Sequence, residues 1–215
     1  MKLVLIGPPG AGKGTQGQRL SRLLSYFHVS TGNLVRAHIQ AWTELGRQVE
    51  GYNRKGELVP DEVILQMVGP SLEPAGRWIL DGFPRTEKQA RVLDEALEAR
   101  GIRLSRAILL EVPDDVLLER IKNRRYSQAT GWTYNLEHDP PPRPEQHLDP
   151  GPFVRREDDT PDAVRRQIEL YHEETAPLKN YYDERGCLAI VDGDRSIDEV
   201  TDYICAVLGH PEKNV

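Results

Sequence analysis

The chain has 215 residues, of which 38% are hydrophobic and 29% are charged, a balance typical of a globular protein and not of a disordered one. This length is enough for one well-packed core with room for insertions. The formal net charge of -6 argues against a general nucleic-acid or membrane-surface binder, although a local basic cluster could still hold a phosphorylated small molecule.

The N-terminus and the cysteines favour a cytoplasmic protein. The first apolar run ends at Ile6, which is too short for a signal peptide, and no stretch approaches the roughly 20 apolar residues of a membrane span. Cys187 and Cys205 each lie within an apolar pattern. This pattern indicates buried free thiols in a reducing compartment, with a disulfide between them as the alternative.

Short apolar runs alternate with helical patterns along the chain. Near-continuous runs of valine, isoleucine and leucine that are separated by helices are typical of a parallel sheet covered on both faces. The sequence therefore predicts a doubly wound α/β core. The expected strands are residues 2–6, 77–81, 106–112 and 187–192, and the clearest expected helices are residues 13–25 and 196–208.

Two stretches interrupt this alternation. Residues 30–59 read as helical and polar, with no strand among them, whereas residues 126–159 are long, irregular and rich in proline. A long irregular segment inside a compact domain usually forms a functional loop or lid. We therefore expect a lid here, with a disordered insertion as the alternative.

The stretch GPPGAGKGT, residues 7–15, directly follows the first expected strand and opens the first expected helix, which is the context of a phosphate-binding P-loop. Its glycines let backbone N–H groups converge on phosphate oxygens, and Lys13 adds a cation. The strict pattern places Ser or Thr directly after the lysine; here Gly14 precedes Thr15, so that hydroxyl would reach Mg²⁺ directly or through water. The residues expected around the ATP phosphates are Gly10, Ala11, Gly12, Lys13, Gly14 and Thr15.

Three further stretches carry a family resemblance: STGN with Arg36, LDGFPRT (80–86) with Gln89, and RREDD (155–159). Together with the P-loop, in this order and spacing, they resemble adenylate kinase over nearly the whole chain. The resemblance implies a five-stranded parallel sheet and reversible transfer of the γ-phosphoryl group of MgATP to AMP, giving two ADP. The implied parts are a P-loop core of residues 1–29, 60–120 and 161–215, a nucleoside-monophosphate-binding domain of residues 30–59, and a lid of residues 121–160.

This chemistry needs two phosphorylated nucleotides held in line while water is excluded. Mobile covers are therefore expected, and adenylate kinases are themselves a standard example of such lid closure. The expected partners are ATP, AMP and ADP, with neither nucleic acid nor membrane, and the family expectation is a monomer.

On the donor side, Arg120 and Arg124 are four residues apart, so one helix would present both on one face. By resemblance they contact donor phosphates, a role for which a planar, permanently charged guanidinium is suited. Without the resemblance, this basic run would read as a solvated helix face. The residues expected around the donor adenine are Thr133, Tyr134 and the backbone of Arg195, and the expected catalytic set is Lys13, Arg85, Arg120, Arg124 and Arg156.

On the acceptor side, Thr31 stands where pyrimidine-nucleotide kinases typically have alanine, which favours AMP over UMP or CMP. Gln89 offers both a donor and an acceptor to an adenine edge. The residues that the resemblance places at AMP are Thr31, Arg36, Glu57, Leu58, Val59, Gly82, Arg85, Gln89, Arg156 and Gln167.

Metal binding is expected only through the nucleotide. Asp81 ends an expected strand, where by resemblance its carboxylate orders the water shell of Mg²⁺; capping a following helix is the alternative. Some family members hold the lid with zinc through four cysteines, but neither cysteine of this chain lies in the lid, and no zinc is expected. We interpret His138, Asp139, His147 and Asp149 as solvated lid residues, because their spacing matches no compact zinc pattern.

Two positions depart from the family pattern. Asn33 replaces the aspartate of the usual STGD, which removes a charge, although it could still cap the following helix. Gln167 replaces an arginine that contacts the phosphates at transfer, and the loss of such a cation from a dry site can be large. The helical spacing of the neighbouring apolar residues turns Arg165 and Arg166 in other directions, so neither replaces it.

Because of Gln167, two alternatives to an active AMP kinase stay open. One is a nucleotide-binding paralogue with reduced or no turnover. The other is a kinase with altered nucleotide choice, such as a GTP donor or a UMP or CMP acceptor. The retained cations favour activity, since the site and not the fold must decide.

The stretch DDTPDAVRRQIELY, residues 158–171, joins the lid to the core. Asp158 and Asp159 are expected to interact within the lid and hinge, and Thr160 and Pro161 to start a helix as N-cap and first-turn proline. The buried stripe expected for this helix consists of Val164, Ile168, Tyr171, Leu178 and Tyr182.

Overall fold

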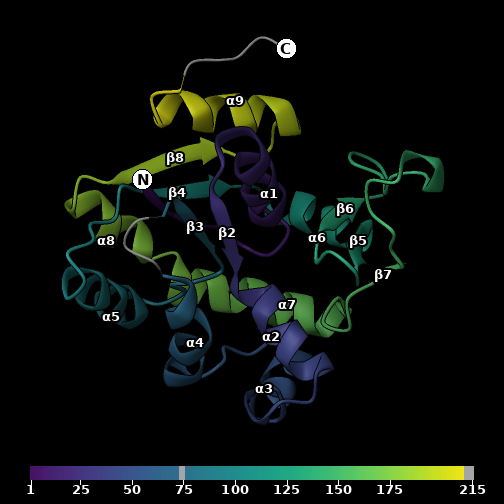
Figure 1. The fold of residues 1–215 in the computed structure, drawn as a ribbon, viewed down its shortest axis with the longest axis horizontal. Coiled ribbons are helices and arrows are strands. Elements are labelled where there is room, and N and C mark those ends of the chain that lie inside the picture. Colours follow the sequence, from purple (N-terminus) through teal and green to yellow (C-terminus); the bar gives the residue numbers. More distant parts are fainter. Residues whose placement is uncertain (73–75, 211–215) are drawn as a thin grey trace.

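The computed structural model describes residues 1–72 and 76–210; residues 73–75 and 211–215, which the expected core segments 60–120 and 161–215 include, lie outside the described residues. A five-stranded, all-parallel sheet forms the centre of the molecule, in the order β2-β3-β1-β4-β8 (Figure 1). This sheet confirms the predicted α/β core. Its strands are β1 (Lys2–Ile6), β2 (Phe27–Ser30), β3 (Trp78–Asp81), β4 (Arg106–Glu111) and β8 (Leu188–Asp192).

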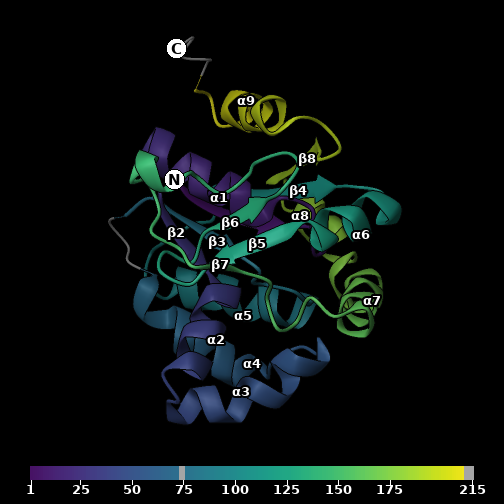
Figure 2. The same ribbon diagram turned by 90° about the vertical axis from the view of Figure 1, so that its right-hand side faces the viewer.

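Helices cover both faces of the sheet (Figure 2). The helices in the described part of the chain are α1 (Lys13–Leu24), α2 (Thr31–Gln40), α3 (Glu44–Lys55), α4 (Asp61–Val68), α5 (Glu87–Glu98), α6 (Asp114–Lys122), α7 (Pro161–Leu170), α8 (Leu178–Glu184) and α9 (Ile197–Val207). Short 3₁₀ turns occur at Gly69–Ser71 and Pro144–Gln146.

The buried strands explain why helices are needed on both faces. Successive side chains of a strand point to opposite faces. In β1, Leu3 and Leu5 join a core cluster with α1, α6 and α9, whereas Val4 and Ile6 join a cluster with α4, α5 and α8. Each face of β1 is therefore apolar, which produces the continuous apolar run seen in the sequence.

The sequence pattern missed β2, an edge strand, because its four residues contain no apolar run. Only Val29 of this strand is buried, and the Phe27 side chain is 62% exposed. The strand leads directly into α2, where Ser30 is the N-cap and accepts a hydrogen bond from the backbone N of Asn33 at 3.4 Å. The expectation that Asn33 itself caps α2 is therefore wrong.

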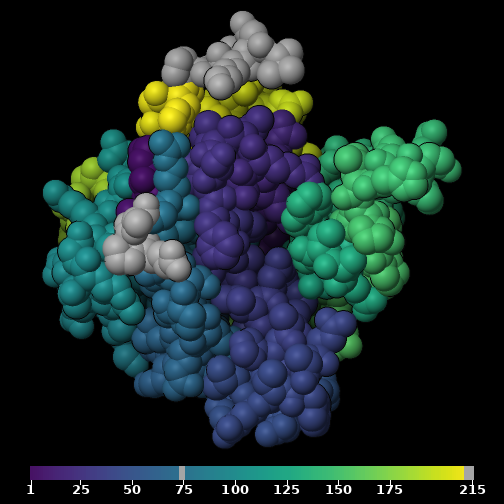
Figure 3. Space-filling model, in the orientation of Figure 1, coloured from purple at the N-terminus to yellow at the C-terminus, as the bar shows by residue number. Residues whose placement is uncertain are grey.

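The lid segment contains a second sheet that its proline-rich sequence did not predict. Three short antiparallel strands, β5 (Arg124–Ser127), β6 (Thr133–Asn135) and β7 (Phe153–Val154), pair in the order β6-β5-β7. Part of this segment (green) stands out from one side of the molecule in Figure 3.

The expected common helix face for Arg120 and Arg124 is also wrong. The helix α6 ends at Lys122 with Asn123 as its C-cap, so Arg124 begins β5 instead. The chain changes direction between the two arginines, and only tertiary structure brings them to the same site.

The helix α7 begins as expected. Thr160 accepts a hydrogen bond from the backbone N of Ala163 at 3.3 Å, and Pro161 occupies the first turn. The expected continuous helix is interrupted by a π-helical turn at Tyr171–Thr175, so Tyr171 is only half-buried. The remaining residues of the expected stripe are buried: Val164, Ile168, Leu178 and Tyr182.

Both cysteines are free, as expected, but each is half-buried and not buried. Burial raises the pKa of the Cys187 and Cys205 thiols. The thiols therefore stay protonated near neutral pH, which keeps them poorly reactive.

Candidate active site

A cleft of about 930 Å³ opens where the parallel strands end. Residues that follow β1, β2, β3 and β8 line it, and the lid and the end of α3 complete its walls. The carboxyl edge of such a sheet is where ligands bind in α/β proteins. All the residues predicted for the donor, acceptor and catalytic sites line this cleft, although their roles toward nucleotides stay predictions.

The lysine of the P-loop is hydrogen-bonded to the backbone of the loop itself. The Nζ atom of Lys13 donates hydrogen bonds to the carbonyl oxygens of Gly7 at 2.7 Å and Pro8 at 2.8 Å. Gly12 adopts φ 96°, a left-handed conformation that glycine tolerates, and starts α1 without a side-chain cap. The N-terminus of α1 thus keeps free N–H groups for an anion. Burial lowers the pKa of Lys13 to about 8.

Asp81 lies at the end of β3, beside the P-loop, and is buried. Burial alone would raise its pKa, but the neighbouring His28 and the charges of Lys13 and Arg156 lower it. The carboxylate therefore stays ionised at neutral pH. The alternative role as a helix cap is wrong, because Thr86 caps the next helix, α5.

His28 is a residue that the sequence did not single out. Its Nε2 atom lies 3.4 Å from Asp81 Oδ2, and a Cβ atom on Gly17 would come within 2.4 Å of the same Nε2. Glycine at this position of α1 thus leaves room for the imidazole. The sequence pattern did not indicate this role, because it did not predict β2, the strand that places His28 next to β3.

Four arginines gather opposite Lys13, and we call Arg36, Arg85, Arg124 and Arg156 the arginine cluster. All line the cleft. Burial lowers the pKa of both Arg85 and Arg156. The positive charges of Arg36 and Arg124 lower the pKa of Arg156 further. Arg36 Nε and Arg156 Nε are buried without a hydrogen-bond partner among residues 1–72 and 76–210. Unpaired buried donors of this kind are favourable only when an anion completes them.

Two carboxylates hold the arginine cluster in place. Arg124 Nε donates to Asp159 Oδ2 at 3.0 Å, and a second Arg124 nitrogen pairs with Asp159 Oδ1. Burial alone would raise the pKa of Asp158, but the charges of Arg36, Arg156 and Arg124 lower it. Both carboxylates are buried and serve as counter-ions inside the lid and hinge, which agrees with the prediction made for them.

Arg120 lies on the donor side, apart from the arginine cluster. Its Nη1 atom donates to the carbonyl of Gly193 at 2.9 Å, and its Nη2 atom lies 3.6 Å from Asp194 Oδ1. Gly193 to Arg195 follow β8, so these contacts connect α6 with the loop that was expected to hold the donor adenine.

The acceptor side explains why Gly82 follows Asp81. Thr31 Oγ1 donates to the carbonyl of Asp81 at 3.1 Å. A Cβ atom on Gly82 would lie only 2.7 Å from the same Thr31 Oγ1. The amide of Gln89 is already engaged, accepting from the backbone N of Arg85 and donating to Asp61 Oδ1, both at 2.7 Å. A base would therefore meet only the remaining hydrogen and lone pair of Gln89.

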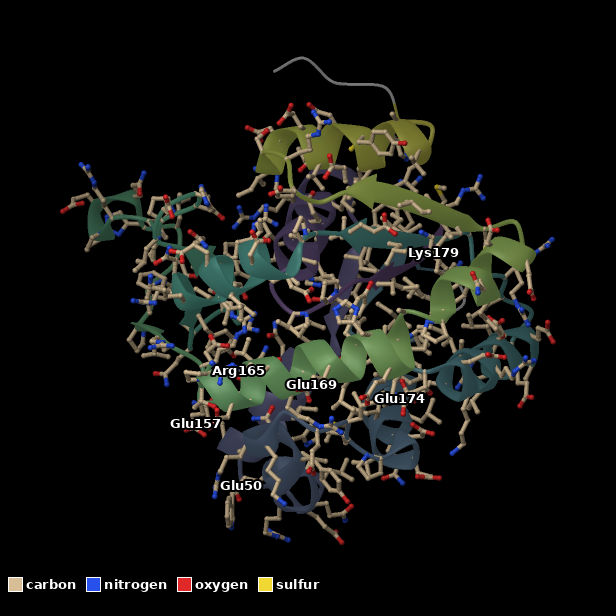
Figure 4. The ribbon with its side chains drawn as sticks, turned by 180° about the vertical axis from the view of Figure 1, so that it is seen from behind. Glu50, Glu157, Arg165, Glu169, Glu174 and Lys179 are labelled. Atoms are coloured by element: carbon tan, nitrogen blue, oxygen red, sulfur yellow. The ribbon has the colours of Figure 1, made fainter. Side chains whose placement is uncertain are left out.

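Gln167 faces the cleft, as the helical spacing predicts, and its Nε2 atom lies 3.4 Å from Asp158 Oδ2. The side chains of Arg165 and Arg166 are 70% and 44% exposed. Figure 4 shows Arg165 and Glu169 on the outer side of α7. Neither arginine therefore fills the place of the missing one.

Asp149 is not solvated, contrary to the prediction. It is buried and accepts hydrogen bonds from Ser127 Oγ at 2.7 Å, Thr130 Oγ1 at 2.6 Å, Tyr134 OH at 2.9 Å and the backbone N of Gly151 at 3.0 Å. Burial alone would raise its pKa, but these bonds lower it. The carboxylate thus connects all parts of the small lid sheet. His138 and His147 are exposed, as predicted, and Asp139 is half-buried.

Two negative findings concern residues 1–72 and 76–210. Within these ranges, no three His, Cys, Asp or Glu side chains come together as a metal site. Among the helices of the same ranges, none is both long enough and apolar enough to cross a membrane.

Comparison with known proteins gives one consistent result. Residues 5–187 match the sequence profile of the family described as adenylate kinase. A protein of Moorella thermoacetica named adenylate kinase is 46% identical over 213 residues, 97% of this chain and 98% of the relative. Proteins of the same name from Salinibacter ruber (42% over 202 residues, 93% of this chain and 94% of the relative) and Clostridium botulinum strain Eklund 17B (41% over 213 residues, 97% and 99%) are similar. These names do not favour the alternatives of an inactive paralogue or a changed nucleotide.

Proposed function

The chain belongs to the adenylate kinase family, and we propose that its cleft performs the family reaction, transfer of the γ-phosphoryl group of MgATP to AMP, between Lys13 and the arginine cluster. The observation that carries this assignment is the pair of buried, unpartnered nitrogens, Arg36 Nε and Arg156 Nε, that border the cleft. Phosphate oxygens are the acceptors that match such forked donors.

On the donor side, we assign Lys13 and the N-terminus of α1 to the ATP phosphates. Lys13 would exchange its two carbonyl contacts for phosphate oxygens. Arg120 and Arg124 would then neutralise the charge that develops on the transferred group. Thr133, Tyr134 and the backbone of Arg195 would enclose the adenine.

On the acceptor side, we assign Arg36, Arg85 and Arg156 to the AMP phosphate. Thr31, Gln89 and the segment Glu57, Leu58 and Val59 would enclose its base, with Gly82 as the floor and Gln167 as a neutral donor. Two sets of cations on opposite sides would hold the phosphates in line, and this alignment lowers the barrier without a covalent enzyme intermediate.

The residues present fit a Mg²⁺ ion that arrives with ATP. Asp81 is ionised, and its Oδ2 atom lies 3.6 Å from where a Cβ atom of Gly14 would be, next to Thr15. Hydroxyl and carboxylate oxygens are the ligands that Mg²⁺ accepts, directly or through its waters. When bound, the ion neutralises phosphate charge; Asp81 would hold its water shell.

We also propose that residues 30–59 and 121–160 are the covers that close on the core of residues 1–29, 60–120 and 161–215, and that the protein works as a cytoplasmic monomer. The small lid sheet gives the second cover a rigid body of its own. The two unpaired thiols support a reducing compartment.

A coupled assay of ADP formation tests the assignment. MgATP is combined with AMP, UMP or CMP, and the series is repeated with MgGTP. The expected result is turnover with AMP that is at least tenfold faster than with either pyrimidine nucleotide. Turnover only with UMP or CMP would refute the acceptor assignment, and nucleotide binding without turnover would support the paralogue instead.

A further inference from the structure

Two contacts hold one turn of the lid against the helices α1 and α2. The turn between β5 and β6 contains Gly131 and Trp132. Asn33 Nδ2, on α2, donates a hydrogen bond to the carbonyl of Gly131 at 3.0 Å. The guanidinium carbon of Arg22, on α1, lies 3.7 Å from the centroid of the Trp132 ring. Two adjacent lid residues are therefore held by side chains from two different helices, α1 and α2.

The contact of Asn33 requires an amide. Its Oδ1 atom accepts from Arg36 Nη2 at 2.6 Å while its Nδ2 atom donates to the lid. An aspartate could accept from Arg36 but would set a carboxylate oxygen against the carbonyl of Gly131, and two acceptors repel. Gly131 has φ +74°, and a Cβ atom there would lie 3.0 Å from Asn33 Nδ2, so this close approach also needs glycine.

The contact of Arg22 supplies a cation to an aromatic face. A guanidinium within about 6 Å of an indole centroid is attracted by the negative face of the ring. Trp132 is half-buried, so the stacking also covers apolar surface. Arg22 and Trp132 do not line the cleft, so their contact needs no nucleotide group, whereas Asn33 and Gly131 both line it.

The turn leads directly into the part of the lid that covers the P-loop. Thr133 follows Trp132, accepts a hydrogen bond from Arg156 Nη2, and lies 3.9 Å from where a Cβ atom of Gly14 would be. A shift of the turn would therefore move Thr133 away from the ATP phosphates and from Arg156.

We propose that Asn33 and Arg22 are positioning residues for phosphoryl transfer, which act through Gly131 and Trp132 to hold the lid closed over ATP. This proposal rests on the proposed role of the P-loop and lid in binding ATP. It also gives Asn33, the departure from the usual STGD, a chemical reason: the amide makes a bond to the lid that a carboxylate cannot make.

The test uses Asn33→Asp, which keeps the size and the bond to Arg36, and Arg22→Ala. The matched control is Arg100→Ala, because Arg100 is exposed in the turn after α5 and its side chain donates to the carbonyl of Ala96. Initial rates give KM for MgATP and kcat, and calorimetry with a non-hydrolysable ATP analogue gives Kd directly. We expect KM and Kd for the ATP ligand to rise about tenfold in Asn33→Asp and about three- to fivefold in Arg22→Ala.

In both variants kcat should stay level or rise, because neither residue touches a reacting group and lid opening often limits turnover. The control should match the parent protein. Trp132 adds an optical readout in a Trp42→Phe background, in which the other remaining tryptophan, Trp78, is buried in the core. The change in emission on binding the analogue should need higher concentrations when Asn33→Asp is added.

An unchanged Kd for the analogue in both variants would overturn the proposal, as would a fall in kcat without a rise in KM. A common fall in kcat and melting temperature would assign these residues a structural role only, which also contradicts it. If the parent protein bound no MgATP, the proposed function and this inference would both fail, whereas normal parent binding with unaffected variants would refute the inference alone.

Discussion

The substitution Gln167→Arg tests whether the cleft lacks a cation. Gln167 Nε2 lies 3.4 Å from Asp158 Oδ2, and the other oxygen of Asp158 is buried without a hydrogen-bond partner among the described residues. An arginine at this position would therefore meet an ionised carboxylate and extend the arginine cluster toward the acceptor phosphate. The new charge would have both a partner and a function.

The expected gain follows from what glutamine already provides. A hydrogen bond from a charged donor is roughly twice as strong as one from a neutral donor. A complete donor to a developing anion in a dry site is worth about 2.7–4 kcal/mol, so replacing a neutral donor by a charged one should gain about half of that. Since Asp158 holds part of the new charge, we expect about 1.4 kcal/mol, or a tenfold faster chemical step.

The assay must isolate that step, because lid opening can mask it in steady-state turnover. Rapid-quench measurement of a single turnover from MgATP to AMP does so. The control is Arg165→Gln, which exchanges the same two residue types on the exposed side of α7 (Figure 4) and should leave the rate unchanged. A single-turnover rate for Gln167→Arg within twofold of the parent would refute the reasoning, since the existing cations would then be sufficient.

Three further predictions concern the rest of the cleft and its supports. Burial lowers the pKa of Lys13 to about 8, and bound phosphate would raise that pKa again. The affinity for MgATP should therefore fall as the pH rises through about 8, by at most about tenfold per pH unit. Calorimetry at pH 7 and 9 measures this fall. Asp149→Ala removes the acceptor for four donors and should lower the stability of the lid by about 2–4 kcal/mol. Amide hydrogen exchange should become faster in residues 124–154, while exchange in β1 and β4 stays unchanged. Gly17→Ala would place a methyl group against His28 and should destabilise the protein by about 1–3 kcal/mol. Gly51→Ala, at a helical position with open space around it, should stabilise the protein by about 0.5–1 kcal/mol. Thermal unfolding compares the two variants, and equal shifts in melting temperature would contradict the packing argument.

The strands that the sequence predicted share one property, a nearly uninterrupted apolar run. In β1 and β4 the interior residues are apolar throughout, so the pattern is visible without any partner. The strand β2 has no such run, whereas β8 has one although both strands lie at the edges of the sheet. The place of β2 depends on pairing with β3, which is a property of the sheet and not of four residues.

The site residues were predictable for a different reason. A P-loop requires its glycines and its lysine at fixed spacings, so the motif is local and can be read directly. Asp149 offers no local signal, because its four donors come from residues spread between 127 and 151 and meet only after the lid sheet has formed. Arg124 was placed in the cleft by resemblance but on the wrong element, since helical spacing alone cannot show that α6 ends at Lys122.

The two departures from the family pattern belong to one connected set of contacts. Gln167 approaches Asp158, the charge of Arg36 acts on Asp158, and Arg36 donates to Asn33, which reaches the lid at Gly131. Asparagine removes a negative charge and glutamine removes a positive one, so together they leave the net charge of the cleft as the family pattern has it. With no arginine at position 167, Asp158 depends on Arg36 and Arg156 as counter-ions. With no aspartate at position 33, Arg36 has no competing carboxylate there. The sequence alone could not reveal this connection, because the two positions meet through Arg36 and Asp158.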